Sequence, residues 1–437
     1  MKSAAQKENF FSALRRIGDK GAAAVLRFLT ENGIVFVLLA ATVLSLAARF
    51  LASPYPTRDV VGYVFAWMKD IRAAGLKNFY SVNADYSPLY LFFVGLLSLV
   101  PGGKEVTVGA YTYPSTWMTV LKGSYFVFDL LNALTVALII RKLTGSKGKA
   151  AAGYLVMTVL PVQFINSAVW GNADAVYACF LLYTLYFSLC GKSKTAFAFF
   201  GLALANKLQA LFLAPFLLYL LLRRKLKFSS VLLVPVAVTA SFLPAYFCGA
   251  SFFEPFGFFG KQVDGYSKLT LGCPNFWQLF AFREENAKLL GTGATVFGLL
   301  AIGVFFALLW LRFIRPTNEN LLTAAAFLVG ITVFFLPHMH ERYFYLLDVL
   351  TVAAAFVRGK RYFLIPVMQL ASGIAYCHYI SGKYFIAPWG EDSVHIAAVL
   401  VAFTLGVLLY DLMKAPTLSL QEELCRLDPS AQEGEQP

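Results

Sequence analysis

The segment LPHMHERY at residues 336–343 is the most informative part of the chain, because it lies between two long apolar runs. The upstream run covers residues 321–335 and the downstream run covers residues 344–357, so each can form most of a membrane helix. A charged side chain at membrane depth costs about 2.5–3.5 kcal/mol on insertion scales, and such residues usually serve a function. Two of the four histidines stand here beside an acid and an arginine. The segment therefore predicts a functional site between two membrane helices.

The composition places the chain among integral membrane proteins. Of its 437 residues 59% are hydrophobic and 14% are charged, which is more apolar surface than a soluble fold buries. The apolar runs predict an all-α, polytopic bundle of roughly 10–13 transmembrane helices, since about 20 residues cross a bilayer. The run at residues 195–222 is interrupted by polar residues and predicts two short helices. The other candidate spans are residues 33–51, 117–140, 150–169, 175–190, 229–248, 291–313, 321–336, 343–357, 362–381 and 394–413.

Basic clusters orient the predicted bundle. Lysine and arginine gather at residues 2–27, 141–149, 223–227 and 358–361, and such an excess marks cytoplasmic loops. We therefore expect both termini in the cytoplasm, most simply that of a bacterium, with the protein in the cytoplasmic membrane. The net charge of +13 then reflects topology and does not predict nucleic-acid binding. In this orientation the short apolar segment 88–100 lies at the outer surface without crossing.

The same pattern predicts three regions. Residues 1–32 form a basic cytoplasmic N-terminus, residues 33–414 form the membrane domain, and residues 415–437 form a polar cytoplasmic tail expected to be disordered. Within the membrane domain, residues 52–116 and 249–290 form long external loops.

Unusual polar residues collect on the predicted outer side. Asp59 follows the first span, and residues 60–76 after it have the amphipathic spacing of an interfacial helix. A secondary transporter or a lipid-linked glycan flippase would usually place such residues near the bilayer midplane in both halves of the chain. A non-catalytic scaffold gives no reason for them to share one face. Their position favours an interfacial enzyme that uses a lipid-borne substrate. The polar pieces are Asp59, DYSPLY at 85–90, WGNAD at 170–174, KLQ at 207–209 and HERY at 340–343.

In this order, the five pieces resemble the GT-C superfamily of membrane glycosyltransferases. The resemblance is strongest to bacterial mannosyltransferase-like relatives of GPI mannosyltransferase II, and it extends from Asp59 to Tyr343. It implies a GT-C-type bundle with a long first external loop. Two residues depart from the pattern, because Ser87 stands where these relatives usually have proline and Asn172 where they usually have glutamine.

The resemblance also implies a reaction on the external membrane face. A sugar, with mannose favoured, passes from a polyprenyl-phosphate donor to a lipid-linked or cell-envelope glycan acceptor by inverting single displacement. Such a step needs a carboxylate to accept a proton and cations to stabilise the leaving phosphate. Asp59 is expected to be the catalytic base. The donor phosphate is expected to contact Arg342, Lys207, His338 and His340. The sugar or acceptor is expected to contact Asp85, Tyr86, Trp170, Asn172, Asp174, Gln209 and Glu341.

Purely structural roles are open for several of these residues. Carboxylates and histidines also suit Mg²⁺ or Mn²⁺, but the external loops have no DxD pair and the basic residues can hold a phosphate unaided. We therefore expect a metal-independent reaction without a cofactor, with a divalent cation as the alternative. The structural alternatives are a helix cap for Asp59 or Asp174, a turn for Asp85, a headgroup contact for Lys207, and an ion pair between Glu341 and Arg342.

Overall fold

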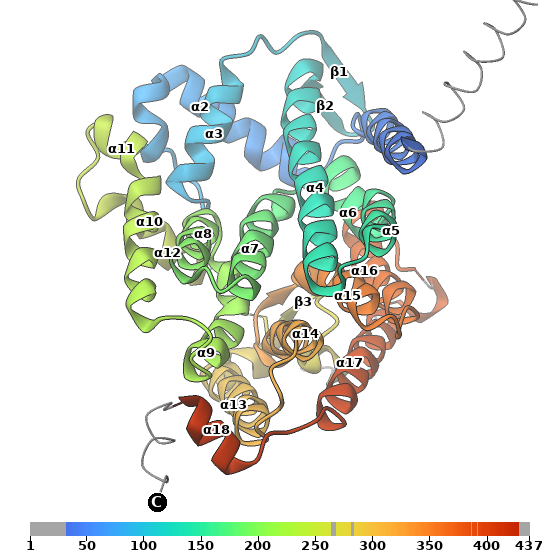
Figure 1. Ribbon diagram of the computed structural model, residues 1–437. Helices are drawn as coiled ribbons and strands as arrows, with labels where there is room; N and C mark the ends of the chain where they lie inside the picture. Colours follow the sequence, from blue (N-terminus) through green and yellow to red (C-terminus); the bar gives the residue numbers. More distant parts are fainter. Residues whose placement is uncertain (1–31, 264–267, 281–283, 386, 391, 428–437) are drawn as a thin grey trace, which may run out of the picture.

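The computed structural model describes residues 32–263, 268–280, 284–385, 387–390 and 392–427. The predicted basic N-terminus, residues 1–32, lies outside this part of the chain except for Asn32. The described residues form a helical bundle with two small pairs of strands, which confirms the predicted all-α membrane class (Figure 1).

Long apolar helices are fewer than the roughly 10–13 predicted. Within the described residues five helices are long and apolar enough to cross a membrane, and one bent pair would make a sixth. Several predicted spans are shorter or broken, because proline begins a new helix where it cannot continue the old one, as at Pro161 and Pro244. The five are Asn32–Ala52, α4 (Ser115–Thr144), Leu290–Leu311 within α13 (Glu284–Leu311), α14 (Asn318–Phe335) and α17 (Asp392–Met413).

Shorter helices fill the space between the long ones. The bent pair consists of Lys147–Thr158 and Pro161–Trp170, which meet at 45°. The shorter helices are α5 (Lys147–Thr158), α6 (Pro161–Phe164), η3 (Ile165–Trp170), α7 (Asp174–Leu189), α8 (Ser193–Asn206), η4 (Leu208–Leu213), α9 (Ala214–Leu222), η5 (Phe228–Leu232), α10 (Leu233–Ser241), α11 (Leu243–Phe247), η6 (Glu254–Phe256), α12 (Gly257–Val263), η7 (Phe276–Leu279), α15 (Tyr345–Arg358), α16 (Leu364–Ser381) and η8 (Ala387–Trp389).

The first predicted external loop is largely helical. Val64, Trp67, Met68 and Ile71 are buried on one side, as the amphipathic spacing predicts, and their helices pack beside α4 (Figure 1). A hairpin that the sequence analysis did not predict follows, with Gly109 at φ 58° in its turn. The elements of this loop are η1 (Asp59–Val64), α2 (Phe65–Ala74), η2 (Leu76–Ser81), α3 (Pro88–Ser98), β1 (Glu105–Val108) and β2 (Tyr111–Pro114).

A second pair of strands fixes the segment between α14 and α15. Strand β3 (Thr270–Leu271) runs parallel to β4 (Met339–His340). Backbone bonds from His338 N to the Leu269 carbonyl (2.8 Å) and from Glu341 N to the Leu271 carbonyl (3.2 Å) extend the contact. The histidine-containing segment is therefore held against the second of the predicted external loops, residues 249–290.

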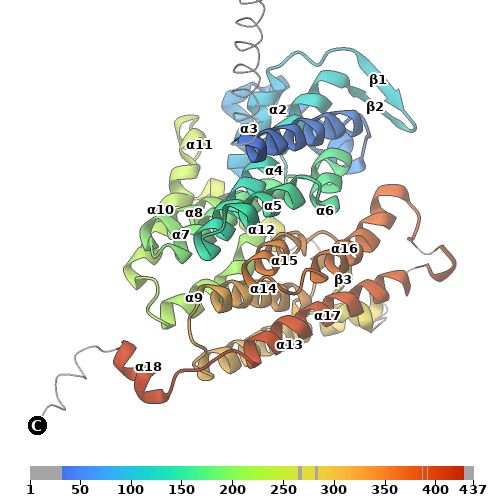
Figure 2. The same ribbon diagram turned by 45° about the vertical axis from the view of Figure 1, so that its right-hand side comes forward.

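The C-terminal tail corrects one prediction. Residues from 415 onward were expected to be disordered, yet helix α18 (Leu420–Leu427) forms there (Figure 2). Glu423 Oε1 lies 2.8 Å from Arg223 Nη1, and both side chains are buried. Ser419 and Glu422 also form a capping box, with reciprocal bonds of 3.1 and 2.6 Å. The capping box could have been predicted from the sequence, because its two residues are three positions apart. The buried pair of Arg223 and Glu423 could not, because its partners are 200 positions apart. Residues 428–437 lie outside the described part.

Candidate active site

A polar cavity of about 320 Å³ lies where the first-loop helices meet the loop before α7 and the segment around β4. Aromatic rings of Tyr63, Trp67, Tyr90 and Tyr379 form part of its wall. Concave sites with aromatic walls and a few converging polar groups are typical ligand sites. The predicted site residues that line it are Asp59, Asp85, Tyr86, Asn172, His340 and Arg342.

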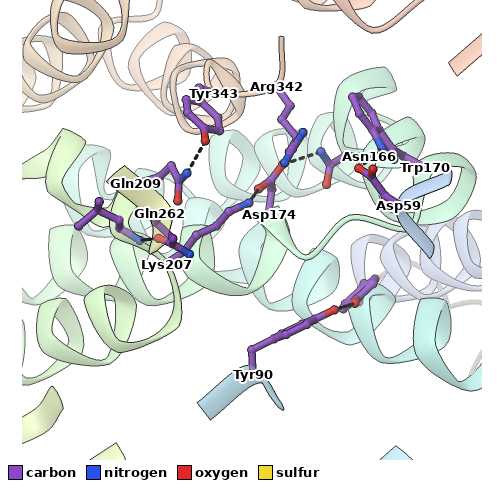
Figure 3. A network of polar contacts seen from close by, with 12 residues as sticks. Asp59, Tyr90, Asn166, Trp170, Asp174, Lys207, Gln209, Gln262, Arg342 and Tyr343 are labelled. Atoms are coloured by element: carbon purple, nitrogen blue, oxygen red, sulfur yellow. Dashed lines mark hydrogen bonds and ion pairs between the residues drawn. The ribbon is translucent and has the colours of Figure 1, made fainter. Parts of the chain in front are cut away.

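Asp59 is the first residue of η1 and is held by two donors. Its Oδ2 accepts a hydrogen bond from Trp170 Nε1 (3.0 Å; Figure 3). Its Oδ1 accepts one from the Tyr379 hydroxyl. The Tyr379 ring stacks on Trp170, with ring centroids 4.5 Å apart. The first turn of η1 is capped by Thr57, whose Oγ1 accepts a hydrogen bond from Val60 N (3.4 Å), and both oxygens of Asp59 are bound elsewhere. The capping alternative for Asp59 is therefore wrong.

Asp174 is the centre of a buried charged cluster. Lys207 Nζ lies 2.6 Å from its Oδ1, and Arg342 Nε lies 3.4 Å from its Oδ2. Asn166 Nδ2 donates to the same Oδ2 at 3.0 Å (Figure 3). Ala173 holds the N-cap position of α7, so Asp174 is not the helix cap. Lys207 is 3% exposed, which excludes the headgroup alternative for its side chain.

The segment 340–342 carries three charged or titratable side chains. Arg342 Nη1 lies 3.0 Å from Glu341 Oε1. The two residues therefore form the ion pair that the sequence analysis gave as a structural alternative. Burial lowers the pKa of His340 below its ordinary value, and the charge of Arg342 acts in the same direction. Burial acts to raise the pKa of Glu341, but His340 and Arg342 outweigh it and the pKa is lowered. At neutral pH we therefore expect a neutral imidazole beside a charged pair.

A second, larger and mostly apolar groove of about 780 Å³ adjoins this site. It is lined by residues of α9, α13 and α14, and by Gln209, His338 and Tyr343. Gln209 Nε2 donates to the Tyr343 hydroxyl at 2.6 Å (Figure 3). Arg342 lines the cavity and its neighbour Tyr343 lines the groove, so adjacent residues of the chain border the two spaces.

His338 belongs to the groove and not to the cavity. Its backbone has φ 63°, a conformation that costs energy for residues other than glycine. The ring Nδ1 lies 2.7 Å from the Lys268 carbonyl. The predicted phosphate-binding residues are thus divided among the cavity, the groove and the Asp174 cluster, and their roles stay predictions.

Two buried carbonyl oxygens are available to a ligand. Asn172 Oδ1 in the cavity wall and Gln209 Oε1 in the groove wall have no hydrogen-bond partner among the described residues. Buried polar atoms are normally paired, so each fits a donor from a bound molecule. The described residues also contain no group of three histidine, cysteine or acidic side chains placed to hold a metal. Metal independence stays a prediction.

Tyr379 is a cavity residue that the sequence analysis did not predict, as are Arg58 and Tyr63. It lies near the end of α16, where tyrosine is common as an anchor at the membrane interface. Nothing in its local sequence separates the two roles. Its contact with Asp59 joins residues 320 positions apart and depends on how α16 packs.

Comparison with known protein families gives a match over most of the membrane helices' sequence region. The model of glycosyltransferase family 87 matches residues 86–337, more than half of the chain. The matched region contains Asn172, Asp174, Lys207 and Gln209, and it ends one residue before His338. No curated protein matches the chain.

Proposed function

Because the chain belongs to glycosyltransferase family 87, a GT-C-type family of membrane mannosyltransferase-like enzymes, we propose a polyprenyl-phosphate sugar as its donor. The family establishes a multi-pass membrane transferase that uses a sugar donor and a glycan acceptor. We further propose that mannose is the sugar, that a lipid-linked or cell-envelope glycan is the acceptor, and that transfer occurs on the external face of a bacterial cytoplasmic membrane.

The observation that carries this proposal is that the adjacent residues Arg342 and Tyr343 border the polar cavity and the apolar groove respectively. A polyprenyl phosphate sugar is an apolar chain joined to a charged and polar head. The groove offers an apolar surface for the chain, and the cavity beyond Arg342 offers polar and aromatic walls for the sugar. At the junction, Arg342 supplies a cation of the kind that binds phosphate through paired hydrogen bonds.

The proposed step is an inverting single displacement. An acceptor hydroxyl attacks the anomeric carbon while the bond from that carbon to the phosphate oxygen breaks. The hydroxyl proton passes to Asp59, and polyprenyl phosphate leaves with the bonding electrons. Asp59 can accept this proton because an ionised carboxylate has about four acceptor positions, of which Trp170 and Tyr379 occupy two. Arg342 stabilises the charge that develops on the phosphate.

Other site residues divide between binding and support. Asp85, Tyr86, Asn172 and His340 line the cavity and are placed to contact the sugar or acceptor. Lys207 was predicted to contact the donor phosphate directly. Its ammonium is bound to Asp174 instead, so we propose an indirect role for it. We propose that this pair orients Arg342, whose Nε lies 3.4 Å from the same carboxylate.

The test is a transfer assay with the purified full-length protein in lipid nanodiscs, radiolabelled polyprenyl-phosphate mannose and a glycolipid extract. Loss of a general base typically lowers the rate by about 10²–10⁴-fold, which is the expected result for Asp59→Asn. Asp70→Asn is the matched control, since Asp70 is exposed on the same stretch of helices and outside the cavity.

Transfer by Asp59→Asn at the wild-type rate would contradict the role of Asp59. Product formed by wild type only with another sugar on the same lipid would contradict mannose and keep the lipid donor. Product formed only with a nucleotide-activated sugar would contradict the lipid donor.

A further inference from the structure

Lys122 is a buried cation that the reaction above does not use. It lies on α4 with 0% of its side chain exposed. Its Nζ donates to three backbone carbonyls, those of Tyr55 (2.6 Å), Ala168 (3.0 Å) and Val169 (2.9 Å). An ammonium has three N–H donors, so this arrangement satisfies every one of them. Among the described residues no carboxylate lies within ion-pair distance of Lys122.

Stability gives no reason for a lysine at this position. A buried charge without an opposite charge is costly, and apolar residues of similar volume usually serve as well or better. The carbonyls of Ala168 and Val169 lie in the last turn of η3, where helical carbonyls have no partner within the helix. A cation there interacts favourably with the negative end of the helix dipole. Lys122 also reaches the Tyr55 carbonyl, which belongs to a different segment.

The two segments that Lys122 joins are those that carry Asp59 and Trp170. Thr57 Oγ1 donates to the Trp170 carbonyl (2.7 Å), and the Trp170 ring donates to Asp59 (3.0 Å). Packing here is close, because a Cβ atom on Gly171 would lie 2.7 Å from Lys122 Cε. The lysine side chain is therefore enclosed in the contact that sets the relative position of the carboxylate and the indole.

We propose that Lys122 is a positioning residue, which holds the segment before Asp59 against the end of η3 so that the carboxylate faces the cavity. The catalytic consequence rests on the proposed function of Asp59 as base. The structural consequence does not, since it concerns only the contact between residues 55–60 and 166–171. A misplacement of about 1 Å in a reacting group can lower a rate by about 10²-fold.

The test compares Lys122→Met, which keeps the side-chain length and removes the donors, with wild type. Thr404→Val is the control, because it removes one buried hydroxyl on α17 that bonds the Leu400 carbonyl. Amide hydrogen exchange, followed by mass spectrometry, is measured in peptides covering residues 55–64 and 166–174. We expect faster exchange in both peptides of Lys122→Met and in neither peptide of Thr404→Val.

Turnover of the same proteins is measured with the polyprenyl-phosphate mannose assay. We expect kcat of Lys122→Met to fall by about 10–100-fold with little change in the donor KM, because the donor site itself is intact. If Lys122→Met does not fold, Lys122→Gln replaces it, since the shorter amide cannot reach both segments at once.

Unchanged exchange in both peptides would overturn the proposal whether or not transfer is detected. Faster exchange with an unchanged kcat would overturn the positioning role. If wild type transfers none of the sugars tested, the exchange comparison still decides whether Lys122 joins the two segments. Failure of the proposed transfer reaction can therefore be distinguished from failure of the proposed role of Lys122.

Discussion

At the level of single residues, the two hydrogen bonds that Asp59 accepts determine how it can act. Donors to both oxygens of a carboxylate fix the direction in which its remaining lone pairs point. Trp170 donates to one oxygen and Tyr379 to the other, and the two rings stack on each other. Among the residues that the structure describes, no cation forms an ion pair with this carboxylate, so the two rings orient it.

Removal of the Tyr379 hydroxyl should therefore weaken catalysis by misorientation. A hydrogen bond to a charged group is worth about 1.5–3 kcal/mol, so we expect Tyr379→Phe to lower kcat by about 10–100-fold. The transfer assay described above measures this change. Tyr362→Phe, at an exposed tyrosine before the same helix, is the control. An unchanged kcat in Tyr379→Phe would show that Trp170 alone orients the carboxylate.

The lowered pKa values of His340 and Glu341 predict a loss of stability in acid. Both groups bind protons more readily in the unfolded chain, so their contribution is complete above the ordinary values of 6.5 and 4.5. It is lost as the pH falls through the lower folded values, first for His340. The Tm of His340→Gln should therefore fall less than that of wild type between about pH 7.5 and pH 5.5. His378→Gln is the control, and equal falls for His340→Gln and wild type would contradict the assignment.

At the level of elements, the apolar groove depends on α9, α13 and α14 remaining apart. Gly303 on α13 contributes to that space, because a Cβ atom there would meet nothing within 4 Å. Gly406 on α17 has the same open surroundings but does not line the groove. The two glycines form a matched pair for testing what the groove binds.

We expect Gly303→Leu to raise the KM for a long-chain polyprenyl donor about tenfold, equivalent to about 1.4 kcal/mol, with kcat nearly unchanged. The effect should shrink with a donor whose lipid is too short to fill the groove. Gly406→Leu should behave as wild type with both donors. Equal kinetics for the two glycine variants would exclude the groove as the lipid site.

At the level of the whole molecule, residues from distant parts of the chain meet around one cavity. The first-loop helices supply part of its lining, and the segment around β4, between α14 and α15, supplies another part. In the bundle, α2 and α3 lie apart from α14 and α15 (Figures 1 and 2). Which side of the membrane the cavity faces is a separate question.

Cysteine labelling determines which side of the membrane the cavity faces. With the native cysteines replaced, Lys383→Cys should react with a membrane-impermeant reagent added outside intact cells, because this exposed residue is near the cavity end of α16. Lys142→Cys, exposed in the last turn of α4, should react only after permeabilisation. The reverse pattern would place the cavity on the cytoplasmic side.

The amino-acid sequence alone predicted the membrane class, the amphipathic first loop and six of the fourteen residues that line the cavity. Each of these follows from local composition, hydropathy or spacing. Asp59, Asp85, Asn172 and Arg342 were identified because polar residues are conspicuous beside apolar runs. The capping box before α18 was equally local and could have been recognised.

Only the tertiary structure decided which of these residues pair. Lys207 binds Asp174, Tyr379 binds Asp59, and Lys122 binds carbonyls of two other segments. Each partner lies on another element, so the pairing depends on how helices pack and on which buried charges must be neutralised there. Periodicity within one helix carries no information about that choice. The separation of an apolar groove from a polar cavity has the same origin, since adjacent residues Arg342 and Tyr343 face different spaces.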